Sequence, residues 1–228
     1  MMNNDARTTP LHPRHLAAGA RMTEFGGWSM PLVYSAILAE PMQVRRRCGL
    51  FDVSHMGRFV LSGAGALACL SELVPTDLSH LAVDHAVYTV FLNEQGGIRD
   101  DLIIYRRPEG YLLVVNAGNR IKDWEWITGH LPSDAQAADN SDHSCLLALQ
   151  GPLAFQVLAD VVPWYPVPPA WAHLRTSRTL PARKASSPAY PRFSCTRVTQ
   201  AKTVWRSWST KNGRRSCGTP FLPPARRG

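Results

Sequence analysis

Apolar positions recur with regular spacing along roughly the first 160 residues of the chain. Alternating or continuous apolar runs are typical of strands, and apolar positions every three to four residues are typical of helices. The pattern predicts strands at 51–53, 58–61, 87–92, 98–105, 111–115 and 145–149, and helices at 35–47, 64–73, 120–130 and 152–158. These elements are interleaved without a regular βαβ rhythm, which predicts an α+β fold with mixed or antiparallel sheets and packed helices.

Turn-forming residues separate several of these segments. Residues 93–97 are Asn-Glu-Gln-Gly-Gly, so the strands on either side are expected to form a hairpin with a five-residue loop. Gly26 and Gly27 stand between two aromatic residues and predict a tight turn or a close backbone approach. Pro41 must lie in the first turn of the helix at 35–47 or break it.

The character of the chain changes near Asp160. Up to that residue there are 17 Asp and Glu against 12 Lys and Arg, whereas Val161 to Gly228 holds no acids and 13 Lys and Arg. From Pro163 onward neither helical nor strand periodicity is sustained. We therefore predict a folded region at 9–160 and an irregular, poorly ordered basic tail at 161–228, and the net charge of +8 is a property of the tail.

The cysteines and the hydropathy of the chain bear on its cellular compartment. The five cysteines are scattered singly without CxxC spacing, which favours reduced cytosolic thiols over disulfides or a zinc site. Residues 1–7 carry an acid and no apolar segment, so no signal peptide is predicted. No run of 18 apolar residues occurs, so no membrane span is predicted either. The expected compartment is the cytoplasm.

Asp100 and Asp101 are the first candidates for chemistry. Paired carboxylates beside a glycine turn could bind a metal, act as acid and base, or orient a ligand. Adjacent side chains on a strand point to opposite faces, so the two cannot easily share one proton or one metal. Only one of them can face a pocket. The alternative interpretation is a solvated strand end next to Arg99.

Other candidates are weighed against plain structural roles. His55 could be a base or a ligand, but it has no HxxxH or Cys partner nearby, and a lone His is more often a hydrogen-bonded structural residue. Trp28, Tyr88 and Tyr105 could form aromatic walls for a flat heterocycle, although such aromatics are usually core. Gly96 and Gly97 lack the pattern of a phosphate-binding loop.

Short motifs stand in a fixed order over nearly all of residues 9–160. They are Thr9-Pro10-Leu11, Gly19-Ala20-Arg21-Met22, Phe25-Gly26-Gly27-Trp28, Met30-Pro31, Gly49-Leu50-Phe51-Asp52-Val53-Ser54-His55-Met56, Gly96-Gly97-Ile98, Asp100-Asp101-Leu102-Ile103, Val114-Val115-Asn116-Ala117 and Ala148-Leu149-Gln150-Gly151-Pro152. Together they resemble the T protein of the glycine cleavage system, the aminomethyltransferase family. One departure is Glu40-Pro41, where the family usually has Glu-His, which bears on local helix geometry more than on activity.

The resemblance implies an α+β folate-binding fold, incomplete in this chain. It also implies a transferase that takes the aminomethyl group from the lipoylated H protein, releases ammonia and leaves a methylene on tetrahydrofolate, without a metal. Asp101 matches the family's catalytic carboxylate, which hydrogen-bonds the folate near its reacting nitrogens. Met56, Tyr88 and Asn116 match positions that line the folate cavity, and Tyr105 is a further candidate.

The tail lacks the family's second folate-contacting motif, Thr-Gly-Tyr-Thr-Gly-Glu-Asp-Gly-Val-Glu. Residues 196–206 have one permitted coding that, begun at its third base, spells that motif in full. Residues 216–222 similarly permit Leu-Trp-Asp-Ala-Leu-Leu in the shifted frame. We therefore hypothesise a frameshift or base-calling error near 161–195 and a spurious stop after Gly228. The expected consequence is a truncated copy with impaired transfer activity.

Two other functions remain as alternatives. One is a non-catalytic folate-binding relative that supports iron–sulfur assembly, against which the continuous match at 49–56 and Asp101 argue. The other is a nucleic-acid binder that acts through the basic tail. It would require a salt-dependent DNA affinity that disappears when 161–228 is deleted. The sequence shows no aromatic and basic platform in a folded domain, so no nucleic-acid partner is expected.

Overall fold

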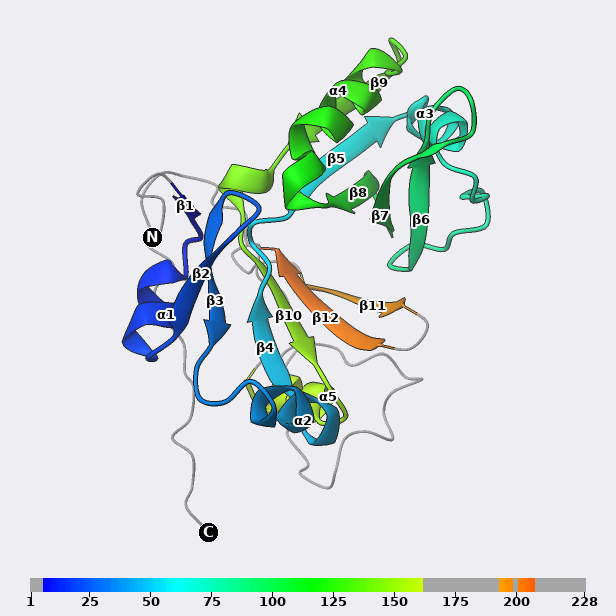
Figure 1. The fold of residues 1–228 in the computed structure, drawn as a ribbon. Helices are drawn as coiled ribbons and strands as arrows, with labels where there is room; N and C mark the ends of the chain where they lie inside the picture. Colours follow the sequence, from blue (N-terminus) through cyan, green and yellow to red (C-terminus); the bar gives the residue numbers. More distant parts are fainter. Residues whose placement is uncertain (1–5, 162–192, 199–200, 208–228) are drawn as a thin grey trace.

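The computed structural model describes residues 6–161, 193–198 and 201–207, which form three sheets with five α-helices around them (Figure 1). The first sheet is small and has the strand order β1-β3-β2. Its elements are β1 (Arg7–Thr8), α1 (His12–Ala17), β2 (Arg21–Phe25) and β3 (Trp28–Val33). Gly26 and Gly27 link β2 to β3 with φ of 58° and 82°, so the predicted tight turn is confirmed.

The second sheet is antiparallel and has five strands in the order β6-β7-β8-β5-β9. Short hairpins join β6 to β7 and β7 to β8, whereas β5 pairs with β8 and β9 from farther along the chain. The strands are β5 (Gly57–Gly63), β6 (Ala86–Leu92), β7 (Ile98–Arg107), β8 (Gly110–Val115) and β9 (Ala135–Asp139). Helix α3 (Ala66–Leu73), the 3-10 turn η1 (Ala117–Asn119) and helix α4 (Arg120–Gly129) belong to the same unit.

The predicted hairpin with a five-residue loop is β6 and β7. Asn93 organises the loop, because its side-chain Oδ1 accepts from the backbone N–H groups of Gln95 and Gly97. Gly96 has a φ of 78°, a conformation that glycine adopts at little cost. The loop chemistry therefore sets the register that places Val90 opposite Asp101.

The third sheet has four strands in the order β11-β12-β10-β4. Strands β4 (Gly49–Asp52) and β10 (Leu146–Gln150) pair with each other, and helices α2 (Ala39–Arg46) and α5 (Ala154–Val161) lie at their end (Figure 1). Gly151 is required there, since its φ is 114° and an added Cβ would come within 2.4 Å of the Val44 carbonyl oxygen. The 3-10 turn η2 (Ser141–His143) precedes β10.

The structure places a hairpin within the region predicted to be an irregular tail. Its strands are β11 (Phe193–Val198) and β12 (Ala201–Ser207), and β12 pairs antiparallel with β10. Strand pairing is made by backbone groups, so a free sheet edge can accept a segment that lacks an alternating apolar pattern. The rest of the tail lies outside the described residues, and the domain division at residue 160 stays a prediction.

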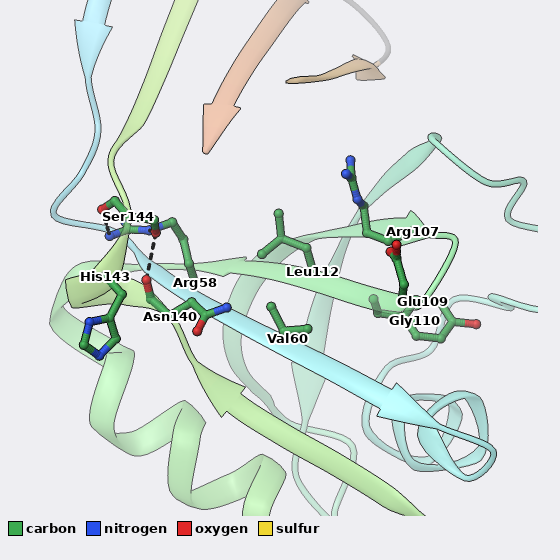
Figure 2. Close-up of a pocket in the computed structure, with 10 residues that line it drawn as sticks. Arg58, Val60, Arg107, Glu109, Gly110, Leu112, Asn140, His143 and Ser144 are labelled. Atoms are coloured by element: carbon green, nitrogen blue, oxygen red, sulfur yellow. Dashed lines mark hydrogen bonds between the residues drawn. The ribbon is translucent and has the colours of Figure 1, made fainter. Parts of the chain in front are cut away.

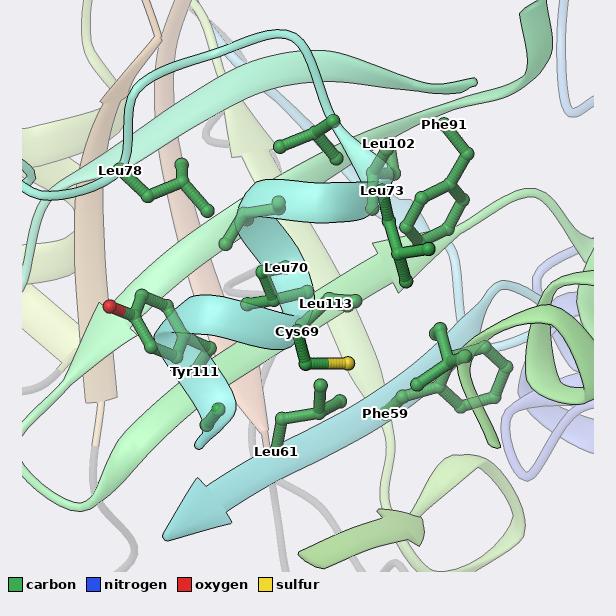
Figure 3. Close-up of a cluster of buried hydrophobic side chains, with 14 of the residues drawn as sticks. Phe59, Leu61, Cys69, Leu70, Leu73, Leu78, Phe91, Leu102, Tyr111 and Leu113 are labelled. Atoms are coloured by element: carbon green, nitrogen blue, oxygen red, sulfur yellow. The ribbon is translucent and has the colours of Figure 1, made fainter. Parts of the chain in front are cut away.

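The five-stranded sheet has an apolar core on the face that carries α3 and α4. Phe59 and Leu61 of β5, Leu113 of β8 and Leu70 of α3 are completely buried in it (Figure 3). The opposite face holds a smaller cluster, made of Tyr105, Val114, Leu146 and Ala148. The last two come from β10, so this cluster joins the two larger sheets.

Two differences from the predicted elements, in α2 and β9, have physical causes. Helix α2 is shorter than the predicted 35–47, and Pro41 lies in its first turn, where a missing backbone N–H costs little. Strand β9 was not predicted, because Ala-Gln-Ala-Ala-Asp lacks the β-branched and aromatic residues typical of strands. It forms through pairing with β5. Helix α1 and strands β2 and β3 were likewise not predicted.

Candidate functional site

Three of the predicted site residues meet at the β6–β7–β8 end of the five-stranded sheet. Asp101 lies on β7, and Tyr88 lies on β6 opposite Ile103, so both side chains are on the same sheet face. The Tyr88 hydroxyl donates a hydrogen bond to Asp101 Oδ2 over 2.9 Å. This is a diagonal cross-strand contact, which an aromatic side chain is long enough to make.

Asn116 supplies the third group, from the position just after β8. Its Nδ2 donates to Asp101 Oδ1 over 3.0 Å and to the Asp101 backbone carbonyl over 3.2 Å. The same nitrogen donates to Asp100 Oδ1 over 3.0 Å. All three partners are acceptors, so the amide orientation follows from the hydrogen bonds. The Asp101 carboxylate is therefore held on two sides.

The Tyr88 hydroxyl is a neutral donor in this arrangement. Its hydrogen bond to Asp101, with the negative charge of that carboxylate, raises the pKa of Tyr88 above its usual range. The Tyr88 side chain is 57% exposed and Asp101 is half-buried. The pair thus forms a fixed carboxylate and a ring that a planar ligand could reach from outside the sheet.

Asp100 is not solvated, so the alternative interpretation of this residue as a solvated end beside Arg99 is wrong. It is only 7% exposed, and its Oδ1 accepts hydrogen bonds from Asn116 and, over 2.7 Å, from Asn119 Nδ2. Burial opposes its ionisation, but hydrogen bonds from Asp123, Asn116 and Asn119 outweigh burial and lower the pKa of Asp100. The prediction that the two adjacent carboxylates face opposite sides of the sheet is confirmed by these partners.

Met56 and Tyr105 lie on the same sheet face as Asp101 but belong to the apolar cluster that joins the sheets. Tyr105 is 2% exposed among Val114, Leu146 and Ala148, and Met56 packs partly buried against them. The structure therefore places them in one cluster, and no hydrogen bond joins either side chain to Asp101 among the described residues. Their predicted contact with folate stays a prediction.

The aromatic wall proposed from Trp28, Tyr88 and Tyr105 is not assembled as a unit. Trp28 lies in the three-stranded sheet, where the Arg7 guanidinium stands 4.3 Å from its ring centroid and the His55 ring meets it edge-on at 6.5 Å. The Phe25 ring also meets the His55 ring edge-on, with the ring centroids 5.9 Å apart. Burial lowers the pKa of His55, which fits an aromatic packing role for this residue.

Arg58 is an important residue that sequence reasoning missed. Its side chain is 1% exposed and uses all of its donors within the protein. Nε donates to Ser144 Oγ, Nη1 donates to the carbonyls of Ser54 and Met56, and Nη2 donates to the carbonyls of Ser141 and Ser144. Burial lowers the pKa of Arg58 to about 10, so it stays charged at neutral pH. An Arg within a strand pattern carries no signal for this role.

A pocket of about 190 Å³ lies beside Arg58 (Figure 2). Val60 and Leu112 form its apolar floor, and Arg107, Asn140 and His143 stand at its rim. Asp101, Tyr88 and Asn116 are not among its lining residues. Because Arg58 has no donor left for a ligand, the Asp101 group carries more specific chemistry than this pocket.

Within the part of the chain that the structure describes, no group of three or more His, Cys, Asp or Glu side chains is placed to hold a metal ion. Over the same residues, no helix has the length and apolar character needed to cross a membrane.

Comparison with known proteins gives a consistent match over the first two thirds of the chain. Residues 11–178 match the family model described as the GCVT N-terminal domain. An aminomethyltransferase of Thermosynechococcus vestitus is 49% identical over 153 residues, which are 67% of this chain and 41% of that protein. An aminomethyltransferase of Geobacillus kaustophilus is 48% identical over 153 residues, covering 67% of this chain and 42% of that protein.

A solved structure supports the fold. The glycine cleavage system aminomethyltransferase T of Bartonella henselae superposes with a TM-score of 0.64 and 40% identity, over 68% of this chain and 43% of that chain. The chain thus spans less than half the length of the curated relatives and of the solved structure that it matches. The predicted α+β class with mixed or antiparallel sheets and packed helices is confirmed.

Proposed function

This chain belongs to the GCVT N-terminal domain family, and we propose that it carries the tetrahydrofolate-binding part of a glycine cleavage aminomethyltransferase. The proposed reaction takes the aminomethyl group from the lipoyl arm of the H protein, releases ammonia and leaves a methylene on tetrahydrofolate. The partners are then tetrahydrofolate and the lipoylated H protein, and the compartment is the cytoplasm, as expected from the sequence. The relatives named above support this function rather than iron–sulfur assembly or nucleic-acid binding.

The observation that carries the proposal is the fixed carboxylate of Asp101. Tyr88 and Asn116 hold it by hydrogen bonds, and each of its two oxygens can accept a further hydrogen bond. A carboxylate is an acceptor for the N–H groups of a flat, nitrogen-rich heterocycle, and the exposed Tyr88 ring offers a surface for such a heterocycle. A pterin is such a heterocycle, because it is flat and carries several N–H groups.

The proposed reaction requires that the folate ring be oriented and that the charge developing on it be stabilised. The methylene carbon exchanges its bonds to sulfur and to the ammonia nitrogen for bonds to two folate nitrogens. Positive charge develops on the attacking amine, and a carboxylate beside it stabilises that charge while it orients the ring. Asp101 is the residue to which we assign this role. Its preorganisation by Tyr88 and Asn116 means that little reorganisation is needed during reaction.

Asp101→Asn tests the assignment in a chain whose C-terminal frame is restored. We expect tetrahydrofolate-dependent aminomethyl transfer to fall by about 10²-fold or more, because an amide cannot balance the developing charge. The melting temperature should change little. Asp77→Asn is the matched control, since Asp77 is an exposed aspartate that bonds only locally to Ser79 and His80. Wild-type transfer rates in Asp101→Asn would remove Asp101 from the mechanism.

We also propose that the chain changes reading frame near 161–195, so that the part after this point is encoded out of frame. The support is the ten-residue motif that the shifted codons of 196–206 permit, together with the absence of acids after Asp160. Sequencing the locus and its transcript tests this directly. Codons that cannot spell Thr-Gly-Tyr-Thr-Gly-Glu-Asp-Gly-Val-Glu in another frame would overturn the proposal. If resequencing reproduces the shifted frame with those codons present, the change lies in the gene. If it gives an unshifted frame with those codons present, the change is a base-calling error.

A further inference from the structure

Two acidic side chains are buried together between β7 and α4, on the sheet face opposite Asp101. Asp123 of α4 is 0% exposed, and Asp100 of β7 is nearly as deep. Carboxylates are almost never fully buried unless they are paired or hydrogen-bonded. The proposed chemistry at Asp101 does not use either residue, so their burial needs a separate explanation.

The hydrogen bonds around this pair are incomplete if both carboxylates are ionised. Asp100 Oδ1 accepts from Asn116 and Asn119, but Asp100 Oδ2 and both Asp123 oxygens have no donor among the described residues. Three buried acceptors without donors would be costly, and two negative charges would face each other. One proton on Asp123 changes this, because its O–H can donate to Asp100 Oδ2.

No neighbouring cation replaces this proton as a hydrogen-bond donor to the two carboxylates among the described residues. Lys122 and Arg99 are the nearby cations, but Lys122 Nζ donates to the Arg99 carbonyl over 2.7 Å, and the Arg99 guanidinium lies 4.2 Å from the Trp126 ring centroid. Neither donates to the two carboxylates among the described residues. Burial, then the hydrogen bond and charge of Asp100, raise the pKa of Asp123 to about 8 against the opposing effect of the two cations.

We propose that Asp100 and Asp123 share one proton at neutral pH and act as positioning residues for Asp101 through the side-chain amide of Asn116. The link is geometric. Asn116 Nδ2 carries two N–H groups, and it stands 3.0 Å from Asp100 Oδ1 and 3.0 Å from Asp101 Oδ1. The amide therefore bridges two carboxylates that lie on opposite faces of β7. The inference rests on the proposed function only for the role of Asp101.

The shared proton keeps this bridge in place. With Asp123 protonated, Asp100 is an ionised acceptor with three donors, from Asn116, Asn119 and Asp123. When the proton leaves, a second buried negative charge forms beside Asp100 and the two carboxylates separate. Asn116 then loses its anchor on the helix side, and Asp101 loses one of the two hydrogen bonds that orient it.

Infrared spectroscopy of the full 228-residue chain tests the shared proton without any folate. We expect one protonated-carboxyl C=O stretching band at neutral pH that disappears as the pH rises through about 8. Asp123→Asn should lack the band, and Asp142→Asn, in an ion pair with Arg120, should keep it. Absence of the band in the wild-type chain would overturn the proposal. If Asp123→Asn does not fold, Asp100→Asn is the second variant, and loss of the band at neutral pH is expected there as well.

Nitrogen NMR of the Asn116 side-chain amide tests the positioning, with Asn116→Ala to assign the signal. In the wild-type chain its chemical shift should change over the same pH range as the infrared band. In Asp123→Asn it should stay constant, because the new amide donates to Asp100 at every pH. A wild-type Asn116 signal that does not respond to this titration would show that the pair is structural only.

Tetrahydrofolate binding separates this inference from the proposed function. We expect the tetrahydrofolate affinity of the wild-type chain to fall by about tenfold as the pH rises through the titration. The affinity of Asp123→Asn should not vary with pH over the same range. A chain that shows both titrations but binds no tetrahydrofolate at any pH would overturn the proposed function and leave the shared proton standing. A pH-independent wild-type affinity would overturn the positioning role.

Discussion

The five-stranded and four-stranded sheets of this protein are assembled in different ways. The five-stranded sheet uses residues 57–139 only, and short connections join β6 to β7 and β7 to β8. The four-stranded sheet takes β4 and β10 from distant positions in the chain and its other two strands from residues 193–207. The five-stranded sheet also has the larger apolar core, packed against two helices.

The candidate functional residues lie in the five-stranded sheet and the elements packed on it. Asp101 and Tyr88 lie on strands of the five-stranded sheet, and Asn116 directly follows β8. Asp100 lies on β7 and Asp123 on α4, which packs on the same sheet. The family model matches residues 11–178, which include this sheet but not the hairpin strands β11 and β12. The hairpin at 193–207 joins through backbone pairing, which many sequences can satisfy. Its place in the sheet is therefore compatible with an out-of-frame origin.

The largest expected effect comes from the core of the five-stranded sheet. Phe59→Ala removes a fully buried ring that packs on Trp124 with centroids 5.0 Å apart. We expect the free energy of unfolding to fall by about 3–5 kcal/mol, measured by urea unfolding. Leu146→Ala in the four-stranded sheet is the comparison, with about 2–3 kcal/mol expected. An equal or larger loss there would show that the four-stranded sheet is the more important for stability.

Removal of Arg58 should disrupt the junction between the two sheets. Arg58→Met leaves buried carbonyls before β5 and before β10 without their donor, so we expect a loss of about 2–4 kcal/mol in urea unfolding. Arg107→Met is the control, since the Arg107 guanidinium makes only a long 3.7 Å ion pair with Asp84, whose side chain is 65% exposed. We expect this variant to lose less than about 1 kcal/mol. Similar losses in both variants would argue against a specific role for Arg58.

The buried acid pair should make stability depend on pH. The pKa of Asp123 is raised to about 8, so above the ordinary pKa of Asp the folded state keeps a proton that the unfolded state has lost. The free energy of unfolding should therefore fall as the pH rises towards about 8, by about 1.4 kcal/mol per pH unit at most. Chemical unfolding at several pH values measures this slope. Asp123→Asn should abolish it, and a slope unchanged in that variant would assign it to other groups.

Deletion of residues 162–228 should have the smallest effect on the candidate site. The hydrogen bonds that join Asp101, Tyr88 and Asn116 involve no residue of the tail. We expect any tetrahydrofolate affinity of the full chain to stay within about twofold, whereas aggregation should increase because the edge of β10 becomes free. Light scattering and binding titration measure the two effects. Loss of binding on deletion would show that the tail contributes to the site.

Much of the five-stranded sheet is predictable because its signals are local. The turn chemistry of 93–97 predicts the β6–β7 hairpin, and strand alternation predicts that Asp100 and Asp101 point to opposite faces. Strand β9 has no such signal, since five residues rich in Ala become a strand only when β5 offers its edge. The partners of Asp100 were equally hidden, because α4 brings Asp123 to it from another part of the chain.

The sequence by itself determined the α+β class, the main hairpin, the family resemblance and the choice of Asp101 as the candidate carboxylate, because these depend on short-range periodicity and on motifs. Only the tertiary structure decided which groups hold that carboxylate, that Asp100 is buried beside Asp123, and that Arg58 joins the two sheets. Those features depend on contacts between residues far apart in the chain. Burial and hydrogen bonding at such contacts, rather than residue type, set the charge and orientation of each group.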